Sequence, residues 1–89
     1  MATFRIQLSA SAIRALQRLP ESVAAAVSNF LTGPLAEEPR RVGKPLRKNL
    51  AGLWTARRGS YRIVYRIDDA DSVIVVARIQ HRADVYRPL

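Results

Sequence analysis

The second half of the chain most constrains the fold, because it has the pattern of a β-hairpin followed by a buried strand. Leu53–Arg57 and Tyr61–Ile67 are rich in β-branched and aromatic residues, and the turn sequence Arg58-Gly59-Ser60 separates them. The polar turn Asp68–Asp71 then leads into Val73–Ile79, a nearly continuous aliphatic run that predicts a central strand buried on both faces. These segments together predict a meander of antiparallel strands.

The first half of the chain predicts one strand and two helices. Ala2–Leu8 alternates between apolar and polar residues, which indicates a strand. Ser9 or Ser11 can cap a first helix, because a serine side chain accepts a hydrogen bond from the free N–H groups of the first turn. Pro20 is suited to the first position of a second helix, which we expect Gly33-Pro34 to end.

Two further segments complete the expected order. Leu35–Gly52 predicts an irregular connection with one short strand or turn, and His81–Tyr86 predicts a turn followed by a short last strand. The order β-α-α-β-β-β(-β) is that of an α+β fold in which a two-helix hairpin packs on a small, mainly antiparallel twisted sheet. With 89 residues and no linker or repeat, the sequence predicts a single domain over 1–89.

The charge of the chain points to a polyanionic partner. The formal net charge is +8 and the pI is about 11.3, which is typical of nucleic-acid-binding domains. The charge is also clustered, because the stretch from Pro39 to Ile67 holds nine basic residues and no acid. These residues are Arg40, Arg41, Lys44, Arg47, Lys48, Arg57, Arg58, Arg62 and Arg66.

The alternation of the second hairpin strand predicts a basic face. Arg62 and Arg66 share one side of that strand, and Arg57 joins them if the hairpin register follows the alternation. Arginine forks onto phosphate oxygens in a bidentate way that lysine cannot match. The alternative is a solvated face paired with acids, but the sequence has too few acids to neutralise the cluster. The candidate acids for such pairing are Asp68, Asp69 and Asp84.

Four aromatic residues lie among these cations. Tyr61 and Tyr65 are expected in the core, whereas Trp54 fits the core and a base-stacking role equally well. Tyr86 lies near the chain end beside Arg82 and is the best functional candidate of the four.

Composition disfavours several other classes of protein. There is no cysteine, a single histidine and few acids, so disulfides are excluded and we expect no metal site. No apolar run reaches the roughly 18 residues that span a membrane, and the N-terminus lacks the pattern of a signal peptide. We therefore expect a cytoplasmic protein.

These features together resemble the RelE/ParE superfamily of bacterial toxins from toxin–antitoxin modules, and the chain looks closest to RelE-type members from actinobacteria. The resemblance covers nearly the whole chain. Two motifs in combination are specific to this superfamily: Gly-x-Tyr-Arg-h-h-Tyr, where x is any residue and h a hydrophobic one, and a terminal His-Arg-x-x-x-Tyr. The matching segments are Gly43-Lys44-Pro45-Leu46, Leu50-Ala51-Gly52-Leu53-Trp54, the run from Arg57 to Asp69, and the run from His81 to Arg87.

This resemblance implies an mRNA interferase, a ribonuclease that cuts messenger RNA in the A site of the small ribosomal subunit. Such enzymes use no metal ion or other cofactor. The 2′-OH attacks the adjacent phosphate and yields a cyclic 2′,3′-phosphate and a free 5′-OH. The resemblance also implies a cognate RelB-like antitoxin, in a complex that is heterotetrameric or larger.

The resemblance implies site residues as well. By position, the catalytic residues are Arg57, Arg62, Arg82 and Tyr86, with His81 at a place that is basic or imidazole in relatives. Because an arginine is a poor base, His81 and Tyr86 are the two candidates for the general base. Relatives usually carry lysines on the strand before the hairpin turn, where this chain has Thr55. Further RNA contacts are expected from Arg58, Arg66, Lys44, Arg47 and Lys48.

Two other functions compete with this hypothesis. The first is a ParE-like inhibitor of DNA gyrase with the same fold and no nuclease site. The second is an inactive relative that only binds RNA. The retained Arg62, Arg82 and Tyr86 and the basic surface favour the ribonuclease.

Overall fold

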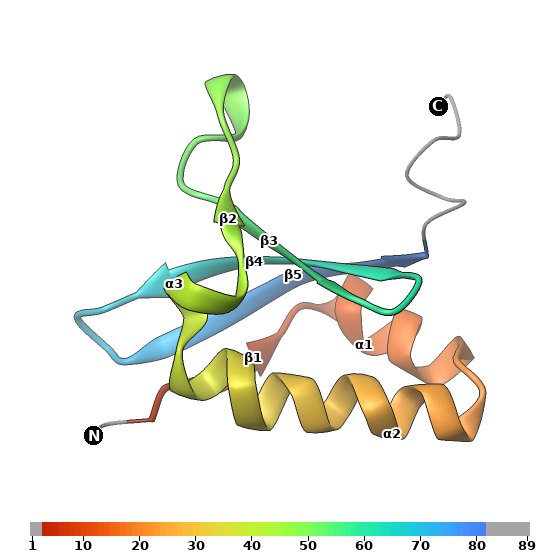
Figure 1. Cartoon of the computed structure of the whole chain (residues 1–89). Helices are drawn as coiled ribbons and strands as arrows, with labels where there is room; N and C mark the ends of the chain where they lie inside the picture. The colour runs from red at the N-terminus through yellow and green to blue at the C-terminus, as the bar shows by residue number, and fades with distance from the viewer. Residues whose placement is uncertain (1–2, 82–89) are drawn as a thin grey trace.

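The computed structural model describes residues 3–81 of the chain. Helical and extended segments follow one another in the predicted order (Figure 1). The helical segments are α1 (Ala10–Arg18), α2 (Glu21–Phe30), the π-helical η1 (Leu31–Leu35), α3 (Pro39–Val42) and the short 3₁₀ turn η2 (Lys48–Leu50). The strands are β1 (Arg5–Leu8), β2 (Lys44–Pro45), β3 (Trp54–Arg58), β4 (Tyr61–Asp68) and β5 (Val73–His81).

The strands form one five-stranded sheet with the order β1-β5-β4-β3-β2. Only β1 and β5 are parallel, and the other three pairs are antiparallel. Both α1 and α2 lie against the same face of the sheet (Figure 1). The α+β fold and the mainly antiparallel sheet are therefore confirmed, and the opposite face of the sheet carries neither of these helices.

The first strand and the cap of the first helix agree with the prediction, although β1 covers only Arg5–Leu8 of the expected range. Pro20 lies immediately before α2 rather than at its first position. Ile6 and Leu8 of β1 are half-buried against the core, whereas Arg5 and Gln7 between them are exposed. Ser9 caps α1, because its Oγ accepts a hydrogen bond from the N–H of Ala12 at 3.0 Å.

The end of α2 differs from the prediction. Gly33-Pro34 does not stop the helix, which continues through the π-helical turn η1. An α-helix would place the Pro34 ring against the carbonyl of Phe30, and the wider π turn accommodates a residue without an N–H. Leu31 and Leu35 of this turn are buried, so packing favours its continuation over termination.

The connection between the helices and the hairpin is more ordered than predicted. Pro39 begins the short helix α3, where its missing N–H is not needed. The two-residue strand β2 then pairs with β3 and forms the sheet edge. Pro45 is tolerated in that strand because an edge strand has one side without a hydrogen-bonding partner.

The last described strand corrects two predictions. β5 continues to His81, so this histidine ends a strand rather than forming part of a turn. β5 is also not buried on both faces, because Val75 and Ala77 are half-buried and Arg78 is exposed. The reason is that the helices cover only one face of the sheet. The predicted strand leading to Tyr86 lies outside the described residues.

Tyr65 lies at the centre of the core and ties the connecting segment to the sheet. It is fully buried, and its hydroxyl donates a hydrogen bond to the carbonyl oxygen of Pro39 at 2.6 Å. Gly43 passes directly against this ring, where a Cβ would overlap the Tyr65 hydroxyl and lie 2.8 Å from the carbonyl oxygen of Thr55. Burial raises the pKa of Tyr65 to about 12, so its hydroxyl remains a hydrogen-bond donor at neutral pH.

Candidate functional site

A basic surface lies on the face of the sheet opposite α1 and α2, and we call it the outer face. Arg57 pairs across the hairpin with Arg62, and Lys44 of β2 pairs with Thr55. Paired residues of antiparallel strands project to the same side. The pairing therefore brings three cations close together on one side of the sheet. Arg57 and Lys44 are exposed, and Arg62 is half-buried.

Next to these cations the surface is hollowed. A cavity of about 410 Å³ opens between the β2–β4 part of the sheet and the end of α3. None of the described residues that line it is an acid and four are cations, so it is suited to an anionic group rather than a cationic one. The lining residues are Arg41, Val42, Gly43, Lys44, Thr55, Ala56, Arg57 and Arg62.

Two acids of the described chain form ion pairs with cations, away from this cavity or at its margin. Arg40 donates to both carboxylate oxygens of Asp69, at 3.1 and 2.6 Å, and these hydrogen bonds hold the pKa of Asp69 below its usual range. Arg41 pairs with Glu38 at 3.0 Å on the exposed side of α3. Within residues 3–81 these are the two ion pairs, so Lys44, Arg57 and Arg62 form no ion pair with an acid of that part of the chain.

The structure does not bring His81 to the same face as Arg62. His81 pairs with Tyr61 at the end of β5, and their rings meet edge to face with centroids 5.0 Å apart. Tyr61 and Arg62 are successive strand residues, so they project to opposite sides. Arg58 also pairs with Tyr61 and is therefore on the helix side of the sheet.

The remaining predicted site residues are spread more widely. Arg66 is on the outer face, four positions along β4 from Arg62. Arg47 and Lys48 lie at and beside η2, at the tip of an arm that extends away from the sheet (Figure 1), so they are not close to the Arg57–Arg62 pair. Arg82 and Tyr86 lie outside the described residues.

Two cations near the site were not predicted from the sequence. Arg41 lines the cavity because α3, an element that the sequence pattern did not reveal, carries it there. Arg78 of β5 pairs with Val64 and is thus also on the outer face. The sequence contains a signal for this, since a charged residue interrupts an otherwise aliphatic run at Arg78.

The aromatic residues of the described chain are mainly structural. Tyr65 is in the core, as predicted. Trp54, which the sequence left open, pairs with Tyr65 and packs against the core on the helix side. Tyr61 is half-buried beside His81 and also packs against the core.

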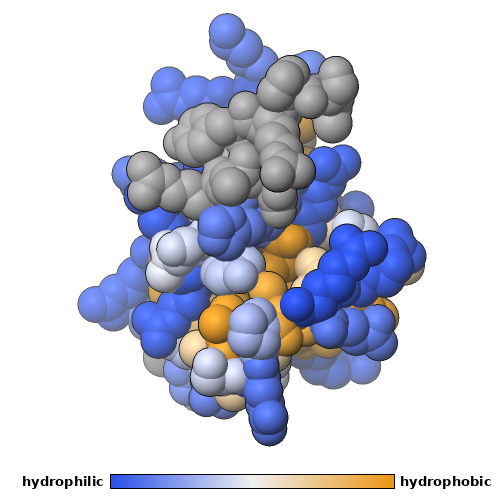
Figure 2. Space-filling model, turned by 90° about the vertical axis from the view of Figure 1, so that its right-hand side faces the viewer, coloured by the Kyte–Doolittle hydropathy of each residue, from blue (hydrophilic) through white to orange (hydrophobic). Residues whose placement is uncertain are grey.

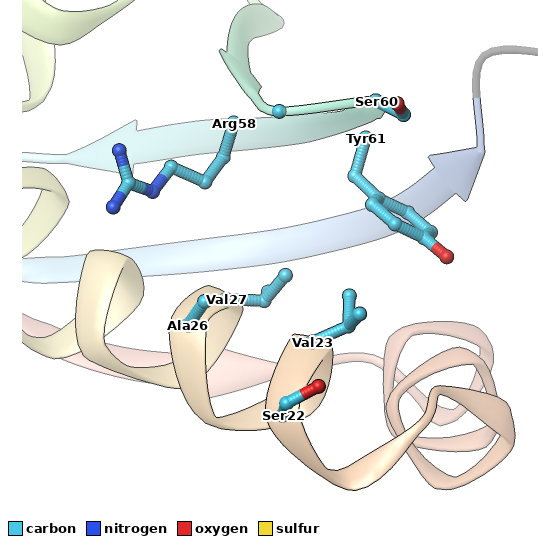
Figure 3. Close-up of a pocket in the computed structure, with 8 residues that line it drawn as sticks. Ser22, Val23, Ala26, Val27, Arg58, Ser60 and Tyr61 are labelled. Carbon is cyan, nitrogen blue, oxygen red and sulfur yellow. The ribbon is translucent and has the colours of Figure 1, made fainter.

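A second hollow, which we call the α2 groove, lies between α2 and the tip of the β3–β4 hairpin. Figure 2 shows apolar surface exposed between hydrophilic side chains on this side of the molecule. In Figure 3, Arg58 and Tyr61 extend from the hairpin into the space above α2, and Val23 and Val27 face them from the helix. The groove thus has an apolar floor and a basic rim. Its lining residues are Ser22, Val23, Ala26, Val27, Arg58, Gly59, Ser60 and Tyr61.

Residues 3–81 contain neither a candidate metal site nor a candidate membrane-spanning helix. No group of three or more histidine, cysteine, aspartate or glutamate side chains there could hold a metal ion. No helix in this part of the chain is both long enough and apolar enough to cross a membrane.

The fold and the acid-poor basic face correspond to a class of small bacterial toxins. Residues 6–86 match the family described as "ParE toxin of type II toxin-antitoxin system, parDE". The chain therefore belongs to the RelE/ParE family of type II toxins, as its sequence predicts.

Individual relatives place the chain near RelE-type members. Toxin RelG of Mycobacterium tuberculosis is 50% identical over 94% of this chain and 97% of its own length. Toxin RelE of the same species is 49% identical over 94% of this chain and 87% of its own length. Both similarities confirm the predicted relationship to RelE-type toxins of actinobacteria.

Solved structures agree with this assignment. A chain in the crystal structure of the toxin–antitoxin complex RelBE2 from M. tuberculosis has a TM-score of 0.87 and 47% identity, covering 91% of this chain and 100% of that one. A chain of the archaeal RelE–RelB complex from Pyrococcus horikoshii has a TM-score of 0.66 and 27% identity, over 91% and 97%. The E. coli RelE mutant in the free state is 19% identical with a TM-score of 0.73, over 96% and 88%, which supports the fold alone.

Proposed function

We propose that this toxin is an mRNA interferase that cuts messenger RNA in the A site of the small ribosomal subunit and thereby stops translation. The observation that carries the proposal is the pair Arg57–Arg62, with Lys44 beside it, on a face of the sheet where these three cations form no ion pair with an acid of residues 3–81. Such fixed cations fit the phosphate of an RNA backbone. The 50% identity to RelG supports the same conclusion.

The proposed reaction is a transesterification within the RNA. The 2′-oxygen forms a bond to phosphorus while the bond from phosphorus to the 5′-oxygen of the next nucleotide breaks. A general base takes the proton of the 2′-OH, and the leaving 5′-oxygen receives a proton. The products are a cyclic 2′,3′-phosphate and a 5′-OH, and the atoms and charges balance without a metal ion or another reactant.

Electrostatic stabilisation is the main contribution that we assign to the described residues. Negative charge grows on the phosphate oxygens in the transition state, and cations that are already in place stabilise it without reorganisation. We assign this role to Arg57 and Arg62, with Arg82 as a further clamp from the end of the chain. Lys44 compensates for Thr55, because these two residues are paired across β2 and β3.

The general base is assigned to the end of the chain. Tyr86 and His81 remain its two candidates. The His81 side chain is on the helix side of the sheet, so its use as the base requires the RNA to reach around the end of β5. This geometry favours Tyr86.

A translating extract, together with a gyrase supercoiling assay, distinguishes the proposed mRNA cleavage from inhibition of DNA gyrase. DNA gyrase inhibition without nuclease activity is the second candidate, and the match to the ParE family description favours it. We expect the purified toxin to stop protein synthesis and to shorten the message only when ribosomes are present, while gyrase supercoiling continues. The reverse pattern, with gyrase blocked and the message intact, would establish the second candidate. A protein that binds RNA but affects neither process would be an inactive relative.

We further propose a RelB-like antitoxin partner, in a complex of two toxins and two antitoxins or larger. The M. tuberculosis RelBE2 complex, which contains a chain with a TM-score of 0.87 to this toxin, supports the proposal. An antitoxin segment with acids would meet Arg57, Arg62 and Arg82, and apolar anchors would enter the α2 groove. Light scattering of the co-purified complex measures its stoichiometry.

A kinetic experiment should distinguish the contribution of the charges of this complex from that of its apolar contacts. Raising salt from ~0.05 to ~0.5 M shortens the Debye length from roughly 14 to 4 Å. Exposed charges mainly accelerate encounter, whereas buried apolar anchors mainly slow dissociation. We therefore expect association to slow markedly and dissociation to change less, as measured by surface plasmon resonance. An association rate that does not respond to salt over this range would contradict the electrostatic role of the basic face.

A further inference from the structure

One strand of the sheet contains an extra residue that changes which side chains face outward. In the pairing of β4 with β5, Tyr65 is opposite Val76, and the preceding residue Val64 is opposite Arg78. Ala77 therefore has no partner on β4 and forms a β-bulge.

The bulge reverses the alternation of β5. Ile74 and Val76 are in the core, two positions apart, whereas the next core residue is Ile79, three positions on. A regular strand would direct Arg78 to the same side as Val76, into the core. Because Ala77 is inserted, Arg78 instead projects from the outer face, on the same side as Arg62.

The bulge is held by a specific contact. The hydroxyl of Ser9 donates a hydrogen bond to the carbonyl oxygen of Ala77 at 2.6 Å, and the Ser9 N–H donates to the carbonyl oxygen of Val76 at 3.0 Å. The same hydroxyl oxygen accepts the capping bond from Ala12. The start of α1 thus fixes the residue at which the alternation of β5 reverses. The outward direction of Arg78 is therefore set by these contacts.

Arg78 completes a zigzag of three cations across β4 and β5. Arg62 and Arg66 are four residues apart on β4, about 13 Å, and Arg78 is opposite the residue midway between them. From the strand separation and the rise per residue, each step from Arg62 to Arg78 and from Arg78 to Arg66 is about 8 Å between Cα atoms. Asp68, the next residue of β4 on this face, directs a carboxylate oxygen to the N–H of Asp71 at 3.0 Å.

We propose that Arg78 and Arg66 form a second phosphate-binding subsite, which holds the RNA strand one or two nucleotides away from the phosphate that reacts at Arg57 and Arg62. The identity of the reacting phosphate rests on the proposed function. The binding of RNA by Arg78 and Arg66 does not depend on it. Single-stranded RNA is the ligand that fits, because its flexible backbone can follow a zigzag of cations on an open sheet surface. Both arginines are exposed, and neither makes an ion pair within residues 3–81.

The test measures binding of RNA that cannot be cleaved. Fluorescein-labelled oligonucleotides with 2′-O-methyl groups, one of about eight nucleotides and one dinucleotide, are titrated with the full-length toxin over a range of salt concentrations. The variants are Arg78→Gln and Arg66→Gln. The matched control is Arg14→Gln, which removes the same charge from an exposed position on α1, in the helix layer.

We expect Arg78→Gln to weaken binding of the longer RNA by about tenfold at low salt, because one charge-assisted contact is lost. The slope of log affinity against log salt should fall in magnitude by about 0.7, the value for one phosphate contact on a single strand. Arg66→Gln should have a similar effect. Affinity for the dinucleotide should stay the same in both variants, and Arg14→Gln should leave all these quantities nearly unchanged.

Two outcomes would overturn the subsite. One is an unchanged salt slope in Arg78→Gln, and the other is an equal loss in Arg14→Gln, which would mean that only net charge matters. Neither result depends on cleavage. If Arg78→Gln shows the expected loss but the wild-type toxin cuts no message, the subsite stands as an RNA-binding site while the proposed function fails.

Discussion

Replacing Arg62 by glutamine is expected to lower mRNA cleavage by about 10²–10³-fold, the usual loss when one pre-positioned donor to a developing oxyanion is removed. Arg62 is half-buried between Arg57 and Gln80, so its guanidinium is better fixed than those of its exposed neighbours. The measurement is the rate of message cutting in a translating extract. Thermal unfolding should stay close to that of the wild-type protein, since Arg62 makes no ion pair with residues 3–81.

A matched substitution controls for net charge. Arg14→Gln removes one positive charge from the exposed surface of α1 and should retain nearly full cleavage. If folded Arg62→Gln cuts the message as fast as Arg14→Gln does, the catalytic site is not on the outer face.

Gly43→Ala is expected to have the largest effect on stability. The new Cβ would overlap the Tyr65 hydroxyl and lie 2.8 Å from the backbone oxygen of Thr55, so α3 and β2 must move away from the sheet. Overpacking of this kind typically costs about 1–3 kcal/mol, which corresponds to a fall in Tm of at least about 4 °C for a domain of this size. Because Lys44 follows directly, RNA cleavage should fall as well.

The chain offers both a control and a partial rescue for this experiment. At Gly33 a Cβ would meet no atom within 4 Å, so Gly33→Ala should be neutral or slightly stabilising. Tyr65→Phe removes the overlapping hydroxyl, and we expect Gly43→Ala to cost less in that background than in the wild type. Equal Tm values for Gly43→Ala and Gly33→Ala would show that the close approach to Tyr65 does not constrain the segment.

Local sequence patterns predicted most of the fold because most of its elements are determined by residues that are neighbours in the chain. The Ser9 cap, the alternation of β1 and the turn at Gly59 each depend on a few neighbouring residues. The family resemblance was confirmed by the match over residues 6–86.

The errors arose where tertiary packing decided the structure. Pro34 was expected to end α2, but the burial of Leu31 and Leu35 favours a π turn that accommodates it. The phase change of β5 at Ala77 depends on a contact with Ser9, 68 residues away in the chain, which no local pattern can reveal.

The same distinction applies to the candidate site. The alternation of the hairpin predicted that Arg57 and Arg62 share a face, and the pairing confirms it. The family resemblance grouped His81 with these arginines, but strand alternation directs it to the other side of the sheet. Arg78 was missed because the nearly continuous aliphatic run Val73–Ile79 was interpreted as a strand buried on both faces.

The most direct test of the central claim is to map the ends of cut messages after the toxin is induced in cells without its antitoxin. We predict new 5′-OH ends within codons at the ribosomal A site, matched by upstream fragments that end in a 2′,3′-cyclic phosphate. Arg62→Gln expressed at the same level should produce few of these ends. Growth arrest with intact messages, or cuts that carry 5′-phosphates, would contradict the proposed ribonuclease.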